Sequence, residues 1–168
     1  MKSIFKLLLA TFLTLAPLTA TAQSNVAHIN VQQLISEMPE VIAAQNELAK
    51  LEKDYTTQID NAFKEFQTKA QSYSSDAANQ TDVTNQARQK ELESMQTNLQ
   101  EFRDSAAQEL QKKQMDLMTP LLDKARNAIT KVGEEQGFNY VIDSSPNGGI
   151  ILANGKDLLA DVKKELGF

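Results

Sequence analysis

Two long stripes of apolar residues, one on each side of a polar segment, constrain what this chain can fold into. Between residues 39 and 133, apolar side chains recur mostly at alternating steps of three and four, the spacing of helices that bury one face. The stripe fades after Tyr73 and resumes near Leu92, and the segment between them is rich in turn and cap residues. The pattern therefore predicts a helical arm over 39–133 whose tip lies near 74–84.

The register of the two stripes predicts an antiparallel coiled-coil hairpin rather than one long rod. If the chain folds back near residue 79, the numbers of facing residues should sum to about 158, as Ile59 and Leu99 do. The numbers of Tyr55 and Phe102 sum to one less. Ala62 is an alternative to Phe63 as the seam residue at that turn. The predicted seam comprises Val41, Leu48, Leu51, Tyr55, Ile59, Phe63, Phe66, Leu92, Met95, Leu99, Phe102, Leu110 and Leu117.

One proline lies inside the second helix of this hairpin. Pro120 follows Thr119 within the apolar stripe. Because proline has no backbone N–H, it removes one helical hydrogen bond and crowds the preceding turn. The sequence predicts a kink of the arm at Pro120, either a bend or a break, that would set the angle between the arm and the rest of the protein.

The segments that flank the arm have the alternation of short strands. Residues 26–31 and 138–143 each read as a strand, and a glycine-rich turn separates the second from a further predicted strand at 150–153. Asp157 is placed to cap a final helix over 158–166. The candidates for the core and assembly surface of this β-rich part are Val26, Ile29, Val141, Ile142, Ile150, Ile151 and Leu152.

The N-terminus has the features of a secretory signal. Lys2 and Lys6 precede an apolar run at 7–18, and Ala-Thr-Ala at 20–22 fits a cleavage site. A membrane anchor is the weaker alternative, because the run is shorter than the roughly 20 residues that span a bilayer. The predicted organisation is a signal peptide at 1–22 and an α+β protein whose β-rich body is formed by 23–38 and 134–168.

Composition excludes several other classes of protein. The chain contains no cysteine, so neither a disulfide scaffold nor a lipid-anchored cysteine is possible. Removal of Lys2 and Lys6 with the signal leaves 15 basic against 22 acidic residues, a net charge of −7. No basic cluster exceeds a pair such as Lys112 and Lys113, whereas nucleic-acid binding requires a basic face.

No motif in the chain predicts catalysis or a cofactor. His28 is the only histidine and has no cysteine or carboxylate cluster near it in the sequence, so a strand histidine is favoured over a metal ligand. The segment 149–157 approaches a phosphate-binding loop, but its spacing is too long and Asp157 stands where Ser or Thr is required. The sequence therefore predicts a protein that is not an enzyme and binds no cofactor or metal.

The order of these features resembles the Skp/OmpH family of periplasmic chaperones. They are the signal peptide, the strand at 26–31 with the segment 32–39, the charged hairpin, Pro120 with Leu121, Leu122 and Ile129, the junction 134–138 before the strand at 140–143, and Asp157 with Leu158. The resemblance implies a periplasmic homotrimer with a shared β-strand body. It also implies that three arms enclose unfolded outer-membrane proteins and prevent their aggregation without ATP.

One departure from the family concerns charge, and one alternative function remains open. The best-known members are strongly basic, so the net charge of −7 argues against lipopolysaccharide binding.

The alternative function is that of a structural coiled-coil spacer of the cell envelope, which should bury its seam continuously to a docking end. Here the seam fades toward Ala70, Tyr73 and Arg88, which predicts a loose polar tip and favours the chaperone.

Overall fold

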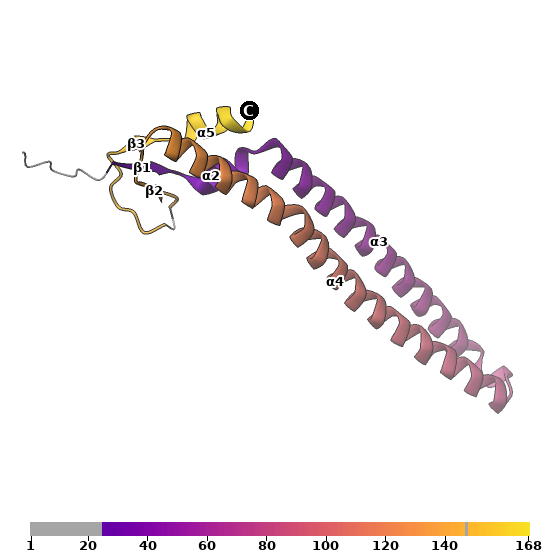
Figure 1. Cartoon of the computed structure of the whole chain (residues 1–168). Coiled ribbons are helices and arrows are strands. Elements are labelled where there is room, and N and C mark those ends of the chain that lie inside the picture. The colour runs from indigo at the N-terminus through magenta and orange to yellow at the C-terminus, as the bar shows by residue number, and fades with distance from the viewer. Residues whose placement is uncertain (1–24, 147) are drawn as a thin grey trace, which may run out of the picture.

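A long helical hairpin projects from a small body in the computed structural model, which describes residues 25–146 and 148–168 (Figure 1). The predicted signal peptide lies outside the described residues. The elements in chain order are β1 (Val26–Ile29), α2 (Val31–Glu37), α3 (Pro39–Asp76), the 3-10 helix η1 (Ala77–Asn79), α4 (Asp82–Glu135), β2 (Tyr140–Asp143), β3 (Lys156–Asp157) and α5 (Leu159–Leu166). Among the described residues, no helix combines the length and apolar character needed to cross a membrane.

The two arm helices begin where local chemistry favours a helix start. Pro39 occupies the first turn of α3, where its missing N–H costs no helical hydrogen bond. At the far end, Thr81 caps α4 because its side-chain oxygen accepts a hydrogen bond from the backbone N–H of Thr84 at 3.2 Å. The chain therefore leaves α3, makes one turn of η1 and re-enters a helix within a few residues.

The helix α4 continues through Pro120 without interruption, so the predicted break at this residue is absent. The N–H that proline lacks would have bonded to the carbonyl of Asp116, and both residues are exposed. Water can therefore satisfy that carbonyl, and the turns on either side maintain the helix.

The sheet contains three parallel strands in the order β2-β1-β3. The predicted strand at 150–153 is wrong: β3 is Lys156–Asp157, which pairs with Ala27 and His28. Gly155 explains where this pairing begins, because a Cβ at that position would lie 2.7 Å from the carbonyl oxygen of Val26. The apolar run before it pairs with no strand among the described residues, and Ile151 is fully exposed.

One core joins the body to the root of the arm. The strand predicted at 26–31 ends at Ile29, and Asn30 then caps α2 by accepting a hydrogen bond from Gln33 N–H at 2.9 Å. The alternation of residues in β1 does not by itself show which face is buried. In the structure the buried face carries Ala27 and Ile29. The buried cluster comprises Ala27, Ile29, Leu34, Met38, Val41, Ala125, Ala128, Val132, Leu158 and Val162. Because both arm helices contribute to it, the hairpin is anchored in the body rather than tethered to it.

Candidate functional site

The hairpin seam contains nearly all of the apolar residues that the stripes predicted. Val41 and Leu99 are buried, and the other predicted seam residues are half-buried except Phe63. The side chain of Phe63 is 40% exposed and stacks on Phe66, with ring centroids 6.5 Å apart. Ala62 is half-buried instead. Steps of three then four fit the stripe as well as four then three, so spacing alone could not choose between these neighbours.

Specific contacts fix the register between α3 and α4. Tyr55 and Phe102 meet edge to face with ring centroids 6.0 Å apart, which confirms this facing pair. The Tyr55 hydroxyl donates a hydrogen bond to the carboxylate of Glu109, and this bond raises the pKa of Tyr55. Nearer the body, Lys113 pairs with Glu47 at 2.8 Å. The carboxylates in these links, Glu109 and Glu47, are exposed, so polar contacts beside the seam set the alignment together with the apolar stripe.

A pair of introduced cysteines should test the seam. We expect Ile59→Cys with Leu99→Cys to form a disulfide within one chain, because both side chains lie on the facing stripes. No native cysteine competes. Mobility on a denaturing gel without reductant distinguishes a crosslink within a chain from one between chains. Ile59→Cys with Glu101→Cys is the matched control and should remain unlinked, since Glu101 is exposed; linkage only between chains in the first pair would contradict the register.

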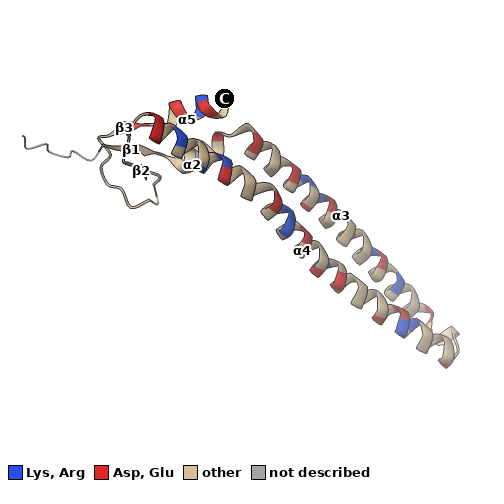
Figure 2. Ribbon diagram, viewed as in Figure 1, with Lys and Arg blue, Asp and Glu red and all other residues tan. Residues whose placement is uncertain are grey.

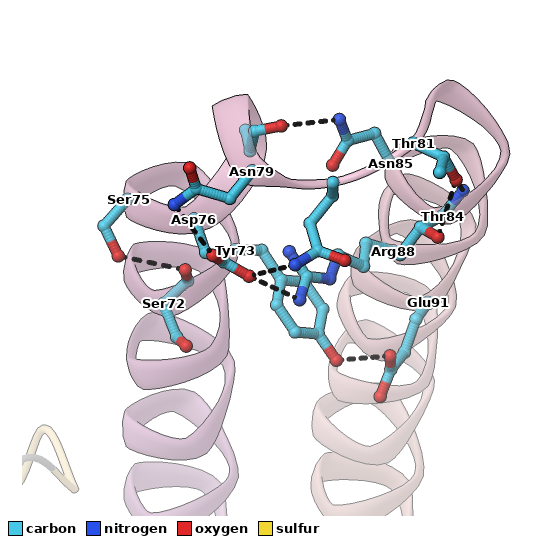
Figure 3. A network of polar contacts seen from close by, with 12 residues as sticks. Ser72, Tyr73, Ser75, Asp76, Asn79, Thr81, Thr84, Asn85, Arg88 and Glu91 are labelled. Atoms are coloured by element: carbon cyan, nitrogen blue, oxygen red, sulfur yellow. Dashed lines mark hydrogen bonds and ion pairs between the residues drawn. The ribbon is translucent and has the colours of Figure 1, made fainter.

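The apolar seam gives way at the end of the arm to a connected set of polar side chains, here called the tip network (Figure 3). It comprises Lys69, Tyr73, Asp76, Arg88 and Glu91. Glu91 accepts hydrogen bonds from Lys69 Nζ and from the Tyr73 hydroxyl, both at 2.6 Å. Arg88 Nη2 donates to Asp76 at 3.0 Å, and the guanidinium lies 4.7 Å from the centre of the Tyr73 ring. The tip is therefore bridged from helix to helix, which corrects the expectation of a loose polar end.

The charges of the tip network stabilise one another. The hydrogen bond from Arg88 lowers the pKa of Asp76, and that from Lys69 lowers the pKa of Glu91. Conversely, the bond to Glu91 raises the pKa of Lys69 and that of Tyr73. Because the carboxylate pKa values are lowered, their stabilising effect is present above the ordinary pKa and is lost as the pH falls through the lowered values. The carboxylates of Asp76 and Glu91 are therefore ionised at neutral pH, and the Tyr73 hydroxyl keeps its proton.

The body exposes an unusual amount of apolar surface. Ile151 is 101% exposed and Leu152 is 75% exposed, and Ile142 and Ile150 are also open to solvent. Tyr140, which the sequence did not single out, belongs with them at 63% exposure. Among the other predicted candidates, Val26 and Val141 are half-buried and Ile29 belongs to the chain's own core. Adjacent apolar side chains without cover are typical of surfaces that meet another chain.

A groove of about 510 Å³ lies where the arm meets the body. Its apolar lining comes from α2, α4 and the segment leading into β2, and includes Ile35, Ile129, Phe138 and Val141. Leu122, 40% exposed, lies at the same site. The groove could not be recognised in the sequence, because its walls come from segments far apart in the chain.

The polar groups of the described residues form no reactive constellation. His28 is half-buried, and its Nδ1 lies 3.2 Å from the Ser144 hydroxyl. Within 25–146 and 148–168, no group of three or more histidines and carboxylates could hold a metal ion. Acidic and basic residues are interleaved along both arm helices, with acidic residues in excess (Figure 2). The candidate functional features are therefore surfaces: the arm, the groove at its root and the uncovered apolar part of the body.

This fold, a long antiparallel helical hairpin rooted in a three-stranded parallel sheet, defines a protein that acts through extended surfaces. Residues 25–166 match the family model described as outer membrane protein (OmpH-like), and the chain belongs to this family. A Yersinia enterocolitica protein named chaperone protein Skp is 26% identical over 159 residues, covering 92% of this chain and 93% of that protein. A Pectobacterium atrosepticum protein of the same name is 20% identical over 151 residues, covering 90% of each.

A solved structure has the same fold. It is that of a putative outer membrane chaperone (OmpH-like) from Caulobacter crescentus, with a TM-score of 0.76 and 12% sequence identity, covering 86% of this chain and 85% of that one. The family match and the two named chaperones support a chaperone role for this chain.

Proposed function

We propose that the protein is an ATP-independent holdase of the periplasm, which binds unfolded outer-membrane proteins between helical arms and prevents their aggregation. The observation that carries this proposal is the combination of family membership with a long arm of polar surface rooted beside exposed apolar groups. The names of the relatives support the chaperone reading over a structural spacer.

Assembly through the body is part of the proposal. Within the described part of the chain, the outer edges of β2 and β3 pair with no further strand. Free strand edges and uncovered apolar side chains are both liabilities for a single chain, and burial against other copies removes both. A homotrimer with its three arms on one side of a shared body would cover these strand edges and apolar side chains. It would also create a space enclosed by the arms.

Client binding would use many weak contacts. The arm carries scattered exposed apolar side chains, among them Ile42, Met115 and Leu122 near its root. Methionine adapts its shape to different partners, which suits clients of varied sequence. The interleaved charges elsewhere on the arm keep it hydrated, and their acidic excess would disfavour strongly acidic clients. With a net charge of −7 after loss of the signal, anionic lipopolysaccharide is not an expected ligand.

An aggregation assay tests the proposed function. A urea-denatured outer-membrane β-barrel protein is diluted into buffer with or without the purified chaperone, and turbidity is followed. We expect near-complete suppression of turbidity at about one trimer per client, unchanged by ATP and magnesium. Turbidity equal to that of an inert protein at the same concentration, or protection only with ATP, would contradict the proposal.

A further inference from the structure

The tip network differs in kind from the rest of the arm, and this difference suggests a conformational role. Along most of the arm, the helices are joined by buried apolar residues, such as Val41 near the root and Leu99 farther out. At the tip, the charged members of the network are only partly enclosed: the side chain of Arg88 is 22% exposed, and those of Lys69 and Asp76 are 37% and 39% exposed. The tip is therefore held by charge rather than by apolar burial.

The links of this network cross from one helix to the other and share partners. Glu91 on α4 binds Lys69 and Tyr73 on α3, and Arg88 on α4 lies on the Tyr73 ring while it pairs with Asp76. Removal of one member therefore disturbs the contacts of the others. The geometry also leaves Arg88 incompletely satisfied, since its Nη1 is buried without a hydrogen-bond partner among the described residues. Such a group weakens the closed state and favours opening when the ion pairs are weakened.

We propose that the tip network is an electrostatic clasp, through which ionic strength sets how often the end of the hairpin opens while the root stays closed. Salt screens charges that are exposed or half-exposed, and the screening length falls from about 30 Å at 0.01 M to about 3 Å at 1 M. Apolar contacts have no such dependence on screening. Opening of the tip would expose the half-buried end of the seam, including Ala70 and Leu92, and would lengthen the surface offered by each arm.

Hydrogen exchange measured by mass spectrometry on the full-length protein tests the clasp. Between 0.02 M and 1 M NaCl at constant pH, we expect amides in 66–95 to exchange at least about threefold faster, since half-exposed ion pairs weaken with salt. Amides in 120–132, at the root, should keep their rates within error. A tip whose exchange does not respond to salt, or a root that responds equally, would overturn the clasp.

A variant identifies the network as the cause. Arg88→Met keeps much of the side-chain length and removes the charge, so at low salt its tip should already exchange at least about tenfold faster, because hydrogen bonds to charged groups and cation–π contacts are lost together. Its further response to salt should be small. Arg103→Met, which removes an exposed arginine from the same helix, is the matched control and should keep both the slow exchange and the salt response.

The outcomes distinguish the clasp from general destabilisation. If Arg88→Met were globally unstable, the root would also lose protection; the substitution Tyr73→Phe, which removes only the hydroxyl bonded to Glu91, then serves as the milder test and should accelerate exchange at the tip alone. A salt response in Arg88→Met as large as that of the unaltered protein would refute the role of this network. The experiment requires no client, so it succeeds or fails independently of the proposed chaperone function.

Discussion

Replacement of Ile151 by aspartate should convert the proposed trimer into single chains. The side chain is 101% exposed, so the substitution removes no contact within the chain and should leave its fold intact. Burial of an isoleucine contributes about 1.5–3 kcal/mol, and an unpaired carboxylate in an apolar interface costs more than the loss of that contribution. Each interface should therefore weaken by at least about tenfold. Light scattering coupled to size-exclusion chromatography over a dilution series measures the mass directly.

The control for this substitution is Val83→Asp. Val83 is an apolar residue at the tip with 76% exposure, so it receives the same chemical change far from the body. It should retain the mass of the unaltered protein at every concentration. Unchanged mass for Ile151→Asp, with circular dichroism showing the native helix content in both variants, would exclude the apolar run at 150–152 as the assembly surface.

Shortening the arm should abolish most of the client protection while it preserves assembly. Deletion of 53–66 from α3 together with 94–107 from α4 removes two heptads from each helix, about 21 Å of arm. The deletions face each other, and they retain both the tip network and the ion pair between Glu47 and Lys113. Since binding through many weak contacts falls steeply with the number of contacts, we expect about fivefold or more short-armed protein to be needed for half-suppression of turbidity.

Two measurements make this result decisive. The short-armed protein should elute with the mass expected for the same number of chains, which shows that the body still assembles. Its root should show the same hydrogen-exchange protection over 120–132 as the full-length protein, which shows that the core is intact. Equal protection of the client by long and short arms would mean that the arms do not form the binding space.

The arm could be predicted from the sequence because its determinants are local and repeated. The spacing of apolar residues, Pro39 in the first turn of α3 and the facing pair Tyr55–Phe102 all follow from helix periodicity and one fold-back. Asp157 accepts a hydrogen bond from the N–H of Leu159 at 2.9 Å, but the N-cap of α5 is Leu158, so the helix begins one residue later than predicted.

The body and the tip were harder to predict because their determinants are contacts between distant segments. The apolar run at 150–153 has strand-forming residues but no neighbouring strand among the described residues. After a gap of two residues β3 begins, where Gly155 lets the backbone approach Val26. At the tip, the fading of the apolar stripe predicts a loose end of the hairpin, although the sequence contains Arg88 and Tyr73 there. Only their alignment across the hairpin shows that they form a network.

The parallel pairing of β1 with β2 has a consequence for how the protein folds. Asn25 and Asn139 are hydrogen-bonded beside these strands although they are 114 positions apart, and the whole arm lies between them. Closing a flexible loop of that length costs about 4 kcal/mol of chain entropy, apart from a constant term. If the hairpin zips first from its tip, it brings both ends of this loop together before the strands pair. We therefore expect the arm to form early and the body late, so that a growing chain completes its sheet only after nearly all of its residues have been synthesised.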